Sequence, residues 1–488
     1  FSLLWTIKMR FIRKEYNYMN FKKIVYDNQE KIIKTFQELL RIPSVLDYDS
    51  ATPNMPFGKN INDALTYMLE LAQKDGFNII NDEGYAGEIS YKTSDSKESV
   101  GILCHLDVVP AGNKWTYPPY EARIVDGKIY ARGATDDKGP TIASYYALKF
   151  IKDANIKLKK EIKIILGTDE ETNWRGIEHY LKKYPMPSIG FAPDCSFPLV
   201  YGEKGRMSFD LSTKDFDDDV VESITGGNRY NVVMDEVEAV LKVNLEKEFN
   251  EYLSNHSLKG FVKDDKYIIE GVAAHAMEPE KGINAGLHMC NFLKNYSKHP
   301  LIDFLATYFY HDPYLKKMNL DYDDFEMGPI TVNVGIMEIS RNRIRVTLDS
   351  RFPVRYDINR FNKVFNELLV KYHLFIANKT YKEPHYISPN DELVKQLYEA
   401  YVKNTGDTTN KPFTVGGGTY AGILDKGVAY GMGFPGEVEL AHQKDEYLAI
   451  LTMYKYVELY NSDKREYIAK DIKNLIQKQL DSSMLNDN

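Results

Sequence analysis

The sequence predicts an α/β fold with a mostly parallel central sheet flanked by helices, and a second, α+β domain inserted into it. Up to about residue 200, buried apolar strands alternate with amphipathic helices, the order expected of a parallel sheet. Between residues 201 and 386, short strands mix with polar helical stretches. Helical and glycine-rich segments then return, so both ends of the chain are predicted to build one domain.

The chain has 488 residues, enough for two domains or for one large domain with an insertion. Hydrophobic residues make up 43% and charged residues 27%, a composition that supports a sizeable core and argues against disorder. We expect residues 19–200 and 387–488 to form the main domain, and residues 201–386 to form the inserted domain. Met19 is the expected start of translation, so residues 1–18 are left out of the fold prediction.

The first expected elements are two helices. Over residues 26–43, apolar side chains such as Ile32, Phe36 and Leu39 recur at helical spacing, and the sequence RIPS ends the helix. A second helix is expected over roughly residues 61–75.

The sheet and its crossovers come next. ESVGILCHLDVVP predicts a buried strand that stops at a His-x-Asp sequence, and IVDGKIYARG predicts a hairpin turning at Asp126–Gly127. TIASYYALKFIKDA predicts a helix, and EIKIILGTDEE predicts another buried strand. In the inserted domain, residues 234–257 are expected to be helical. A helix in YISPNDELVKQLYEAYVKNTG, a glycine-rich strand region and a helix over 444–461 complete the main domain.

Charge and cysteine content narrow the class of protein. The formal net charge of −8 argues against nucleic acid or an anionic membrane as the main partner. No run of about 18 apolar residues occurs, so no membrane span is expected. The three cysteines, Cys104, Cys195 and Cys290, give no disulfide framework and favour a reducing, cytoplasmic location. We expect Cys104 and Cys195 to be buried, facing away from the polar residues beside them.

Polar side chains gather where the predicted strands end. Carboxyl ends of parallel strands form one edge of a sheet, so these side chains should meet there. They are two histidines and six acidic residues: His105, Asp107, Asp136, Asp137, Glu170, Glu171, Asp194 and His442. Carboxylates repel one another unless cations lie between them.

This set of ligands is typical of zinc, with cobalt or manganese as less favoured substitutes. Two metal ions fit better than one, because the acids are too many for a single tetrahedral site. One of the adjacent glutamates should therefore bind metal while the other stays free. Taken singly, an Asp pair before a helix is typical of an N-cap and a Glu pair is typical of a solvated loop.

Six segments carry a resemblance to a known family: HLDVVPAGNKW, YARGATDDKGP, GTDEETNWRGIEHYL, FAPDCSFPLVYGEKG, GGGTYAGIL and AHQKDEY. They resemble the di-zinc aminoacylase/carboxypeptidase superfamily, and most closely the bacterial dipeptidase V type, the carnosinase-like Xaa-His dipeptidases. The resemblance runs from about residue 25 to the C-terminus. It implies a zinc-exopeptidase-like catalytic domain with an inserted lid domain.

The resemblance also implies the metal ligands. His105 and Asp194 would hold the first zinc, Glu171 and His442 the second, and Asp136 would bridge both. Asp107 would orient His105, since a metal-bound imidazole needs its other nitrogen fixed.

Glu170 would be the general base of the implied reaction. It would take a proton from a metal-bridged water that attacks the peptide carbonyl, and would return that proton to the leaving amine.

Three residues of the inserted domain resemble substrate contacts of the family. His275 matches an oxyanion histidine, Asn231 a substrate-contacting asparagine, and Arg351 an arginine that pairs with the substrate's free carboxylate. Gly417 and Gly418 would line the C-terminal pocket. Alternatively, His275 is a structural loop residue, Asn231 a turn residue and Arg351 a surface strand residue. The other histidines match no motif: 179, 256, 288, 299, 311, 373 and 385.

The resulting expectation is a cytoplasmic di-zinc exopeptidase that cleaves dipeptides with free termini. The long insertion resembles a double-sized lid, so a monomer is expected. An N-acyl-amino-acid amidohydrolase of the aminoacylase or desuccinylase type would share the same metal site. A non-catalytic metal- or peptide-binding protein is disfavoured, because Glu170 is present together with all five ligands.

Overall fold

The computed structural model describes residues 21–214 and 218–460, and these form two compact units. The first unit takes the chain up to Tyr201, Ile387–Phe413 and the residues from Thr419 onward. The second unit takes Gly202–Tyr386 and Thr414–Gly418. The last of these segments differs from the sequence analysis, which assigned all of 387–488 to the main domain. The expected start at Met19 lies outside the described residues.

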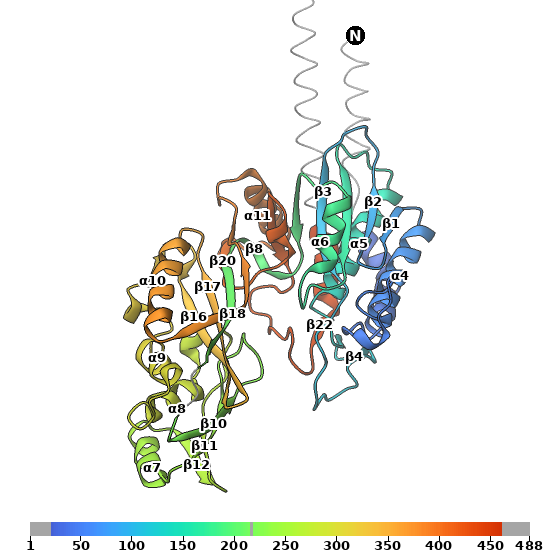
Figure 1. The fold of residues 1–488 in the computed structure, drawn as a ribbon. Helices are drawn as coiled ribbons and strands as arrows, with labels where there is room; N and C mark the ends of the chain where they lie inside the picture. Colours follow the sequence, from blue (N-terminus) through green and yellow to red (C-terminus); the bar gives the residue numbers. More distant parts are fainter. Residues whose placement is uncertain (1–20, 215–217, 461–488) are drawn as a thin grey trace, which may run out of the picture. The chain divides into compact units, whose positions relative to one another are not determined.

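The first unit is built on a mixed sheet in the order β1-β2-β6-β3-β7-β21-β8 (Figure 1). Strands β6, β3, β7 and β21 run parallel, whereas β1, β2 and β8 are antiparallel to their neighbours. The predicted parallel sheet is therefore confirmed for its centre, with antiparallel strands beyond it. The bounds are β1 Asn78–Asp82, β2 Ala86–Tyr91, β3 Ser99–His105, β6 Glu161–Gly167, β7 Ile189–Ala192, β8 Cys195–Glu203 and β21 Gly427–Gly431. The short strands β19 (His385–Tyr386) and β20 (Phe413–Val415) pair with β8.

Helices pack on this sheet close to the positions expected from the sequence, except that the helix expected over 444–461 begins only at residue 450, because Tyr447–Ala449 form a strand. The helices are α2 Phe21–Asp27, α3 Gln29–Leu40, α4 Lys59–Lys74, α5 Lys138–Asp153, α6 Arg175–Lys183 and α11 Glu392–Thr405, with helical residues 450–460 and the 3-10 turns Tyr48–Ser50 and Tyr420–Ile423. Helix α5 is buried along most of its length and contacts β3 and β6. A small sheet has the order β22-β5-β4, with β4 Arg123–Val125, β5 Lys128–Tyr130 and β22 Tyr447–Ala449. The predicted hairpin turn joins β4 to β5, and both Asp126 and Gly127 have the positive φ that this turn requires.

The second unit is an antiparallel sheet with helices against it, so it has the expected α+β character. Its strand order is β12-β13-β11-β10-β16-β17-β9-β18. The bounds are β9 Gly205–Thr213, β10 Val221–Gly226, β11 Glu236–Leu241, β12 Lys259–Lys263, β13 Lys266–Glu270, β16 Thr331–Ser340, β17 Arg343–Phe352 and β18 Leu374–Lys382. The helices are α7 Glu246–Asn255, α8 Ala285–Leu293, α9 Pro300–Tyr308 and α10 Ile358–Lys371, drawn in Figure 1. The short elements are β14 Asp323–Asp324, β15 Gly328–Pro329 and the 3-10 turns Pro279–Lys281 and Lys316–Met318.

One core joins the sheet and helices of the second unit. Met289 of α8, Leu305 of α9 and Phe365 of α10 are buried with Leu211 and Val346 of the sheet. This burial explains why the second unit holds together without a disulfide, since apolar area removed from water is the main stabilising contribution.

The predicted helix over residues 234–257 is wrong in its first part. Residues Glu236–Leu241 form strand β11, and only Glu246–Asn255 form a helix, α7. Val237, Ala239 and Leu241 are buried in alternation with more exposed neighbours, the period of a strand. The acidic residues Glu236 and Glu238 on either side of Val237 obscured that period in the sequence.

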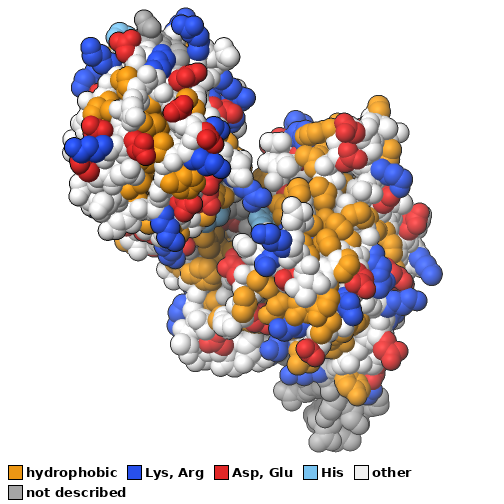
Figure 2. Space-filling view, turned by 90° about the horizontal axis from the view of Figure 1, so that it is seen from below, with side chains coloured by type: hydrophobic (Ala, Val, Ile, Leu, Met, Phe, Trp, Pro, Cys, Tyr) orange, Lys and Arg blue, Asp and Glu red, His pale blue; other side chains and the backbone are white. Residues whose placement is uncertain are grey.

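The surface carries charges of both signs. On the face drawn in Figure 2, acidic and basic side chains are interspersed rather than separated by sign. Within the described ranges, no helix combines the length and the apolar character needed to cross a membrane. Cys104 and Cys290 are buried, whereas Cys195 is only partly buried, which corrects the expectation for that residue.

Three histidines that matched no motif gather in the second unit. The ring of His288 lies 6.0 Å from that of His256 and 5.3 Å from that of His311, centroid to centroid. Nδ1 of His288 lies 3.2 Å from the hydroxyl of Tyr252. Burial, together with the neighbouring histidines, lowers the pKa of His288 to about 4.

We expect the second unit to lose stability as the pH falls from about 6.5 towards 4. In this range the unfolded chain takes up a proton at His288 but the folded unit does not, because the folded pKa is the lower one. The contribution is fully present above pH 6.5 and amounts to at most about 3 kcal/mol, since one pKa unit corresponds to about 1.4 kcal/mol. Urea unfolding of the parent and of His288→Gln across this range measures it. The same pH dependence in both proteins would contradict the assignment.

Candidate metal centre

The predicted ligands lie at the ends of strands in the first unit. His105 is the last residue of β3, Glu170 and Glu171 follow β6, and Asp194 follows β7. Since β6, β3 and β7 are parallel neighbours, their carboxyl ends share one edge of the sheet. The two remaining residues come from loops: Asp136 just before α5, and His442 before β22.

Asp136 lies between the two histidines. Its Oδ1 is 2.9 Å from Nε2 of His105, and its Oδ2 is 3.0 Å from Nε2 of His442. Nε2 of His105 is also 3.8 Å from Oδ2 of Asp194, and Nε2 of His442 is 3.0 Å from Oε2 of Glu171. One carboxylate therefore connects two clusters of nitrogen and oxygen atoms.

Each cluster has the composition of a metal site. Potential ligand atoms of His105, Glu170 and Asp194 lie within 4.8 Å of one another, and those of Asp136, Glu171 and His442 do the same. Glu170 thus lies where a ligand could lie, although the sequence analysis kept it uncoordinated. The geometry leaves both roles open to this side chain.

The carboxylates of the site carry unfavourable charge without a cation. Burial and the neighbouring Asp136 raise the pKa of Glu171 to about 7 and that of Asp194 to about 6. Burial and Asp194 raise the pKa of Glu170 well above its usual range. Asp136 differs: burial acts to raise its pKa, but hydrogen bonds with both histidines lower it overall. The raised pKa values indicate that negative charge at Glu171, Asp194 and Glu170 is unfavourable unless positive charge lies nearby.

The donor set fits divalent cations. Imidazole nitrogens and carboxylate oxygens are the ligands that zinc takes in catalytic sites, and each cluster keeps few enough of them to leave a position open. Cations there would remove the repulsion from Asp136 that otherwise favours the protonated forms of Glu171 and Asp194.

Asp107 supports the centre in two ways. Its backbone carbonyl lies 2.9 Å from Nδ1 of His105, whereas its carboxylate is 3.6 Å from that nitrogen. The carboxylate instead accepts the backbone N–H groups of Glu170 at 3.1 Å and of Glu171 at 3.0 Å. The orientation of His105 is thus fixed mainly by a backbone group, and the carboxylate fixes the turn that carries both glutamates.

Asp137 does not cap helix α5 with its side chain. It stands at the N-cap position, but its Oδ2 accepts the backbone N–H of His105 at 3.1 Å. The side chain is completely buried. The alternative interpretation of the Asp pair as an N-cap is therefore wrong for this carboxylate.

Further buried charges surround the centre that were not predicted from the sequence. Asp169 accepts hydrogen bonds from the side chain and backbone of Arg175, which closes the loop after Glu170. Arg132 and Glu446 form a buried ion pair of 2.6 Å. Asp169 lies in GTDEE and Glu446 in AHQKDEY, both next to residues predicted as ligands. The sequence alone does not show which of several neighbouring acidic residues accepts backbone N–H groups.

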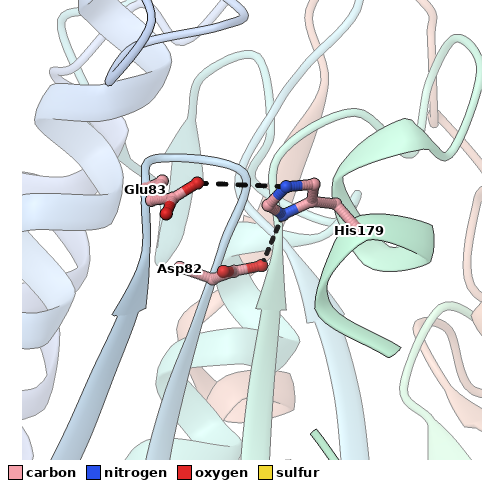
Figure 3. A group of neighbouring side chains, drawn as sticks. All are labelled: Asp82, Glu83 and His179. Carbon is pink, nitrogen blue, oxygen red and sulfur yellow. Dashed lines mark hydrogen bonds and ion pairs between the residues drawn. The ribbon is translucent and has the colours of Figure 1, made fainter. Parts of the chain in front are cut away.

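Another histidine–carboxylate cluster lies at the β1–β2 turn (Figure 3). Nδ1 of His179 is 2.7 Å from Asp82, and Glu83 lies on its other side. Nζ of Lys183 is 2.9 Å from Asp82 and 3.1 Å from Glu83, so an ammonium group already supplies the positive charge. The ring of His179 also stacks on Tyr85 at 4.0 Å. This cluster is best explained as an ion-pair network that joins α6 to the hairpin.

The predicted substrate contacts lie near one another in the second unit. The backbone N–H of Ala276, beside His275, donates to the carbonyl of Asn231 at 2.9 Å. Arg351 pairs with Thr331 across β17 and β16, and the hydroxyl of Thr331 lies 3.5 Å from the carbonyl of Ala276. The structure thus brings Asn231, His275 and Arg351 into one region.

Arg351 is buried and partly engaged, which the surface-strand alternative did not anticipate. Its Nε donates to Asp349 at 2.6 Å, and its Nη1 donates to the carbonyl of Gly416 at 3.2 Å. Gly416 precedes Gly417 and Gly418, which belong to the same unit. Nη2 has no hydrogen-bond partner among the described residues and remains available to a ligand.

Comparison with known proteins identifies the family. A model described as peptidase family M20/M25/M40 matches residues 101–462. A relative from Bacillus subtilis, named "Putative dipeptidase YtjP", is 38% identical over 460 residues, covering 91% of this chain and 98% of the relative. A Staphylococcus epidermidis relative named "Putative dipeptidase" is 38% identical over 463 residues, covering 90% and 97%.

Solved structures agree at the level of the fold. The dipeptidase Dug1p of Saccharomyces cerevisiae has a TM-score of 0.57 at 12% identity, covering 91% of this chain and 97% of that one. Human carnosine dipeptidase 1 has a TM-score of 0.54 at 15% identity, covering 91% and 98%. Family match, close relatives and fold all agree with the resemblance predicted from the motifs, and the chain belongs to peptidase family M20/M25/M40.

Proposed function

We propose that this protein hydrolyses dipeptides with free termini and that it does so with two zinc ions. The observation that carries the proposal is Asp136, whose two oxygens lie 2.9 and 3.0 Å from the imidazoles of His105 and His442. Family membership and the dipeptidase names of its relatives support the same activity.

His105 and Asp194 would hold one ion, Glu171 and His442 the other, and Asp136 both. Two such cations, when bound, lower the pKa of a water and polarise the carbonyl of the substrate.

Glu170 is proposed as the general base. One of its carboxylate oxygens takes a proton from the attacking water and later delivers it to the leaving amine. The carboxylate of Asp107 holds the backbone N–H groups of Glu170 and Glu171, so it fixes the direction in which the base points. A fixed base loses less entropy on reaching the transition state than a mobile one.

The second unit is proposed to contribute three substrate contacts. His275 would donate a hydrogen bond to the oxyanion, Asn231 would contact the substrate backbone, and Arg351 would bind the free carboxylate. Asp349 supports this role for Arg351. It accepts a hydrogen bond from Nε, and because both side chains are buried, this contact fixes the guanidinium while Nη2 is left for the substrate.

We expect Arg351→Gln to raise KM for a dipeptide by roughly 10- to 100-fold, the effect of losing a hydrogen bond to a charged group. The matched substrate is the same dipeptide with a C-terminal amide, which lacks the carboxylate and should respond far less. Steady-state kinetics on the two substrates give the comparison. An equal loss on both would assign Arg351 to the structure of β17 rather than to the substrate.

A substrate panel tests the proposed activity itself. Zinc-loaded protein is assayed with free dipeptides, including β-Ala-His, with tripeptides, and with N-acyl amino acids. Turnover of free dipeptides supports the proposal. Turnover confined to N-acyl amino acids would favour the amidohydrolase alternative, and no turnover with two bound zinc ions would favour a binding protein. The cytoplasmic location and the monomeric state stay predictions, the second of which gel filtration with light scattering can check.

A further inference from the structure

We propose that the buried pair Arg132–Glu446 clamps together the two loops that carry Asp136 and His442, and thereby sets the zinc affinity of that half of the centre. The inference rests on the proposed function, because it takes Asp136, Glu171 and His442 as the ligands of one ion. The two residues would act as positioning residues, without touching metal or substrate.

The pair is closely bonded and removed from water. Nη1 of Arg132 lies 2.6 Å from Oε2 of Glu446, and their side chains are 2% and 0% exposed. Two charges buried in this way lose much hydration energy, so the remaining hydrogen-bonding atoms of both groups need partners. Where those partners lie shows what the pair does.

Glu446 holds the loop that leads into Asp136. Its Oε1 accepts the backbone N–H of Thr135 at 2.8 Å, the hydroxyl of Thr135 at 3.0 Å and the backbone N–H of Asp136 at 3.3 Å. Its Oε2 also accepts the backbone N–H of Gly133 at 3.1 Å. One carboxylate therefore fixes the backbone directly before the proposed bridging ligand.

Arg132 holds the loop that carries the histidine. Its Nη2 donates to the carbonyl of His442 at 3.2 Å, and its Nη1 donates to the carbonyl of Gln443 at 3.1 Å. The guanidinium is a rigid fork, so the three contacts of Arg132 fix a geometry that a lysine could not reproduce. Arg132 thus holds the start of segment 442–446, and Glu446, at the end of that segment, holds residues 135 and 136.

These contacts favour one half of the centre, because Arg132 holds the loop of His442, whereas Asp136, held by Glu446, is shared by both halves. The backbone of His105 is held instead by Asp137, and that of Glu170 by Asp107. A buried ion pair kept only for packing could be replaced without consequence for a distant site. Among the described residues, the side chains of Arg132 and Glu446 form hydrogen bonds only with each other and with the two loops that carry Asp136 and His442.

The experiment isolates each half of the centre before disturbing the clamp. In an Asp194→Ala background, zinc binding reports on Asp136, Glu171 and His442. In a His442→Ala background, it reports on His105, Asp136 and Asp194. Zinc affinity is measured by competition with a chromophoric chelator, with Arg132→Lys and Glu446→Gln placed in each background.

We expect both clamp variants to weaken zinc binding about 10- to 100-fold in the Asp194→Ala background, the usual effect of losing an outer partner of a ligand. In the His442→Ala background, the loss should be clearly smaller, because only the hold of Glu446 on the shared ligand Asp136 is then affected. Arg132→Lys keeps the charge, so it serves as the test variant if Glu446→Gln does not fold. Unchanged affinity in the Asp194→Ala background, or equal losses in both backgrounds, would overturn the inference.

The control is a second buried ion pair of the same unit. Glu88 lies 3.0 Å from Nζ of Lys163, and their side chains are 4% and 9% exposed. Glu88→Gln should lower the thermal midpoint and leave zinc affinity unchanged in both backgrounds, which separates a loss of stability from a loss of positioning. A parent protein that binds fewer than two zinc ions would contradict the proposed function instead of the clamp.

Discussion

Replacing Glu170 with glutamine is expected to lower kcat by about 10²- to 10⁴-fold, the usual contribution of a positioned general base. Glutamine has almost the same shape, so the backbone contact of residue 170 with Asp107 at 3.1 Å should persist. The amide cannot take up a proton, and the step that needs the base should slow. The rate of dipeptide hydrolysis under saturating substrate measures the effect.

The number of bound metal ions distinguishes the two roles open to Glu170. If it is the base, Glu170→Gln should keep two zinc ions per chain, counted by elemental analysis after dialysis. Loss of one ion would make Glu170 a ligand, as its place beside His105 and Asp194 also allows. Glu98→Gln is the control, because the carboxylate of Glu98 is exposed and pairs with Lys160 on the surface. A Glu170→Gln variant with the turnover and zinc content of the parent would contradict both roles.

The positions of the predicted ligands could be inferred from the sequence because they follow buried strands. His105 ends β3, and Asp194 follows β7, so the apolar run that predicts each strand also predicts where its polar end will lie. His442 was different: the sequence grouped it with the ends of the glycine-rich strand region, but it lies well after β21, in the loop before β22.

The groups that hold the ligands in place could not be inferred in this way. Glu446 accepts N–H groups from a segment more than 300 residues earlier in the chain. Asp137 points to the backbone of His105 rather than to its own helix. Contacts of this kind depend on tertiary packing, for which hydrophobic periodicity carries no information. The same limit applied to β11, where Glu236 and Glu238 beside Val237 concealed a strand.

Asp136 gives the second large expected effect, because one side chain serves both halves of the centre. We expect Asp136→Asn to weaken the binding of both zinc ions and to abolish turnover, since the two oxygens of Asp136 lie 2.9 and 3.0 Å from the two imidazoles. The loss of affinity should exceed the roughly 10- to 100-fold typical of an outer partner.

Two variants serve as controls for Asp136→Asn, because each should affect one ion only. Asp194→Asn removes a charge beside His105, and His442→Gln removes the imidazole beside Glu171, so each should leave about one zinc ion per chain. The three proteins are compared by zinc titration and elemental analysis. A single lost ion in Asp136→Asn would mean that the carboxylate belongs to one site alone. In that case the two clusters would be independent sites, and the bridging arrangement on which the proposed two-metal hydrolysis depends would have to be abandoned.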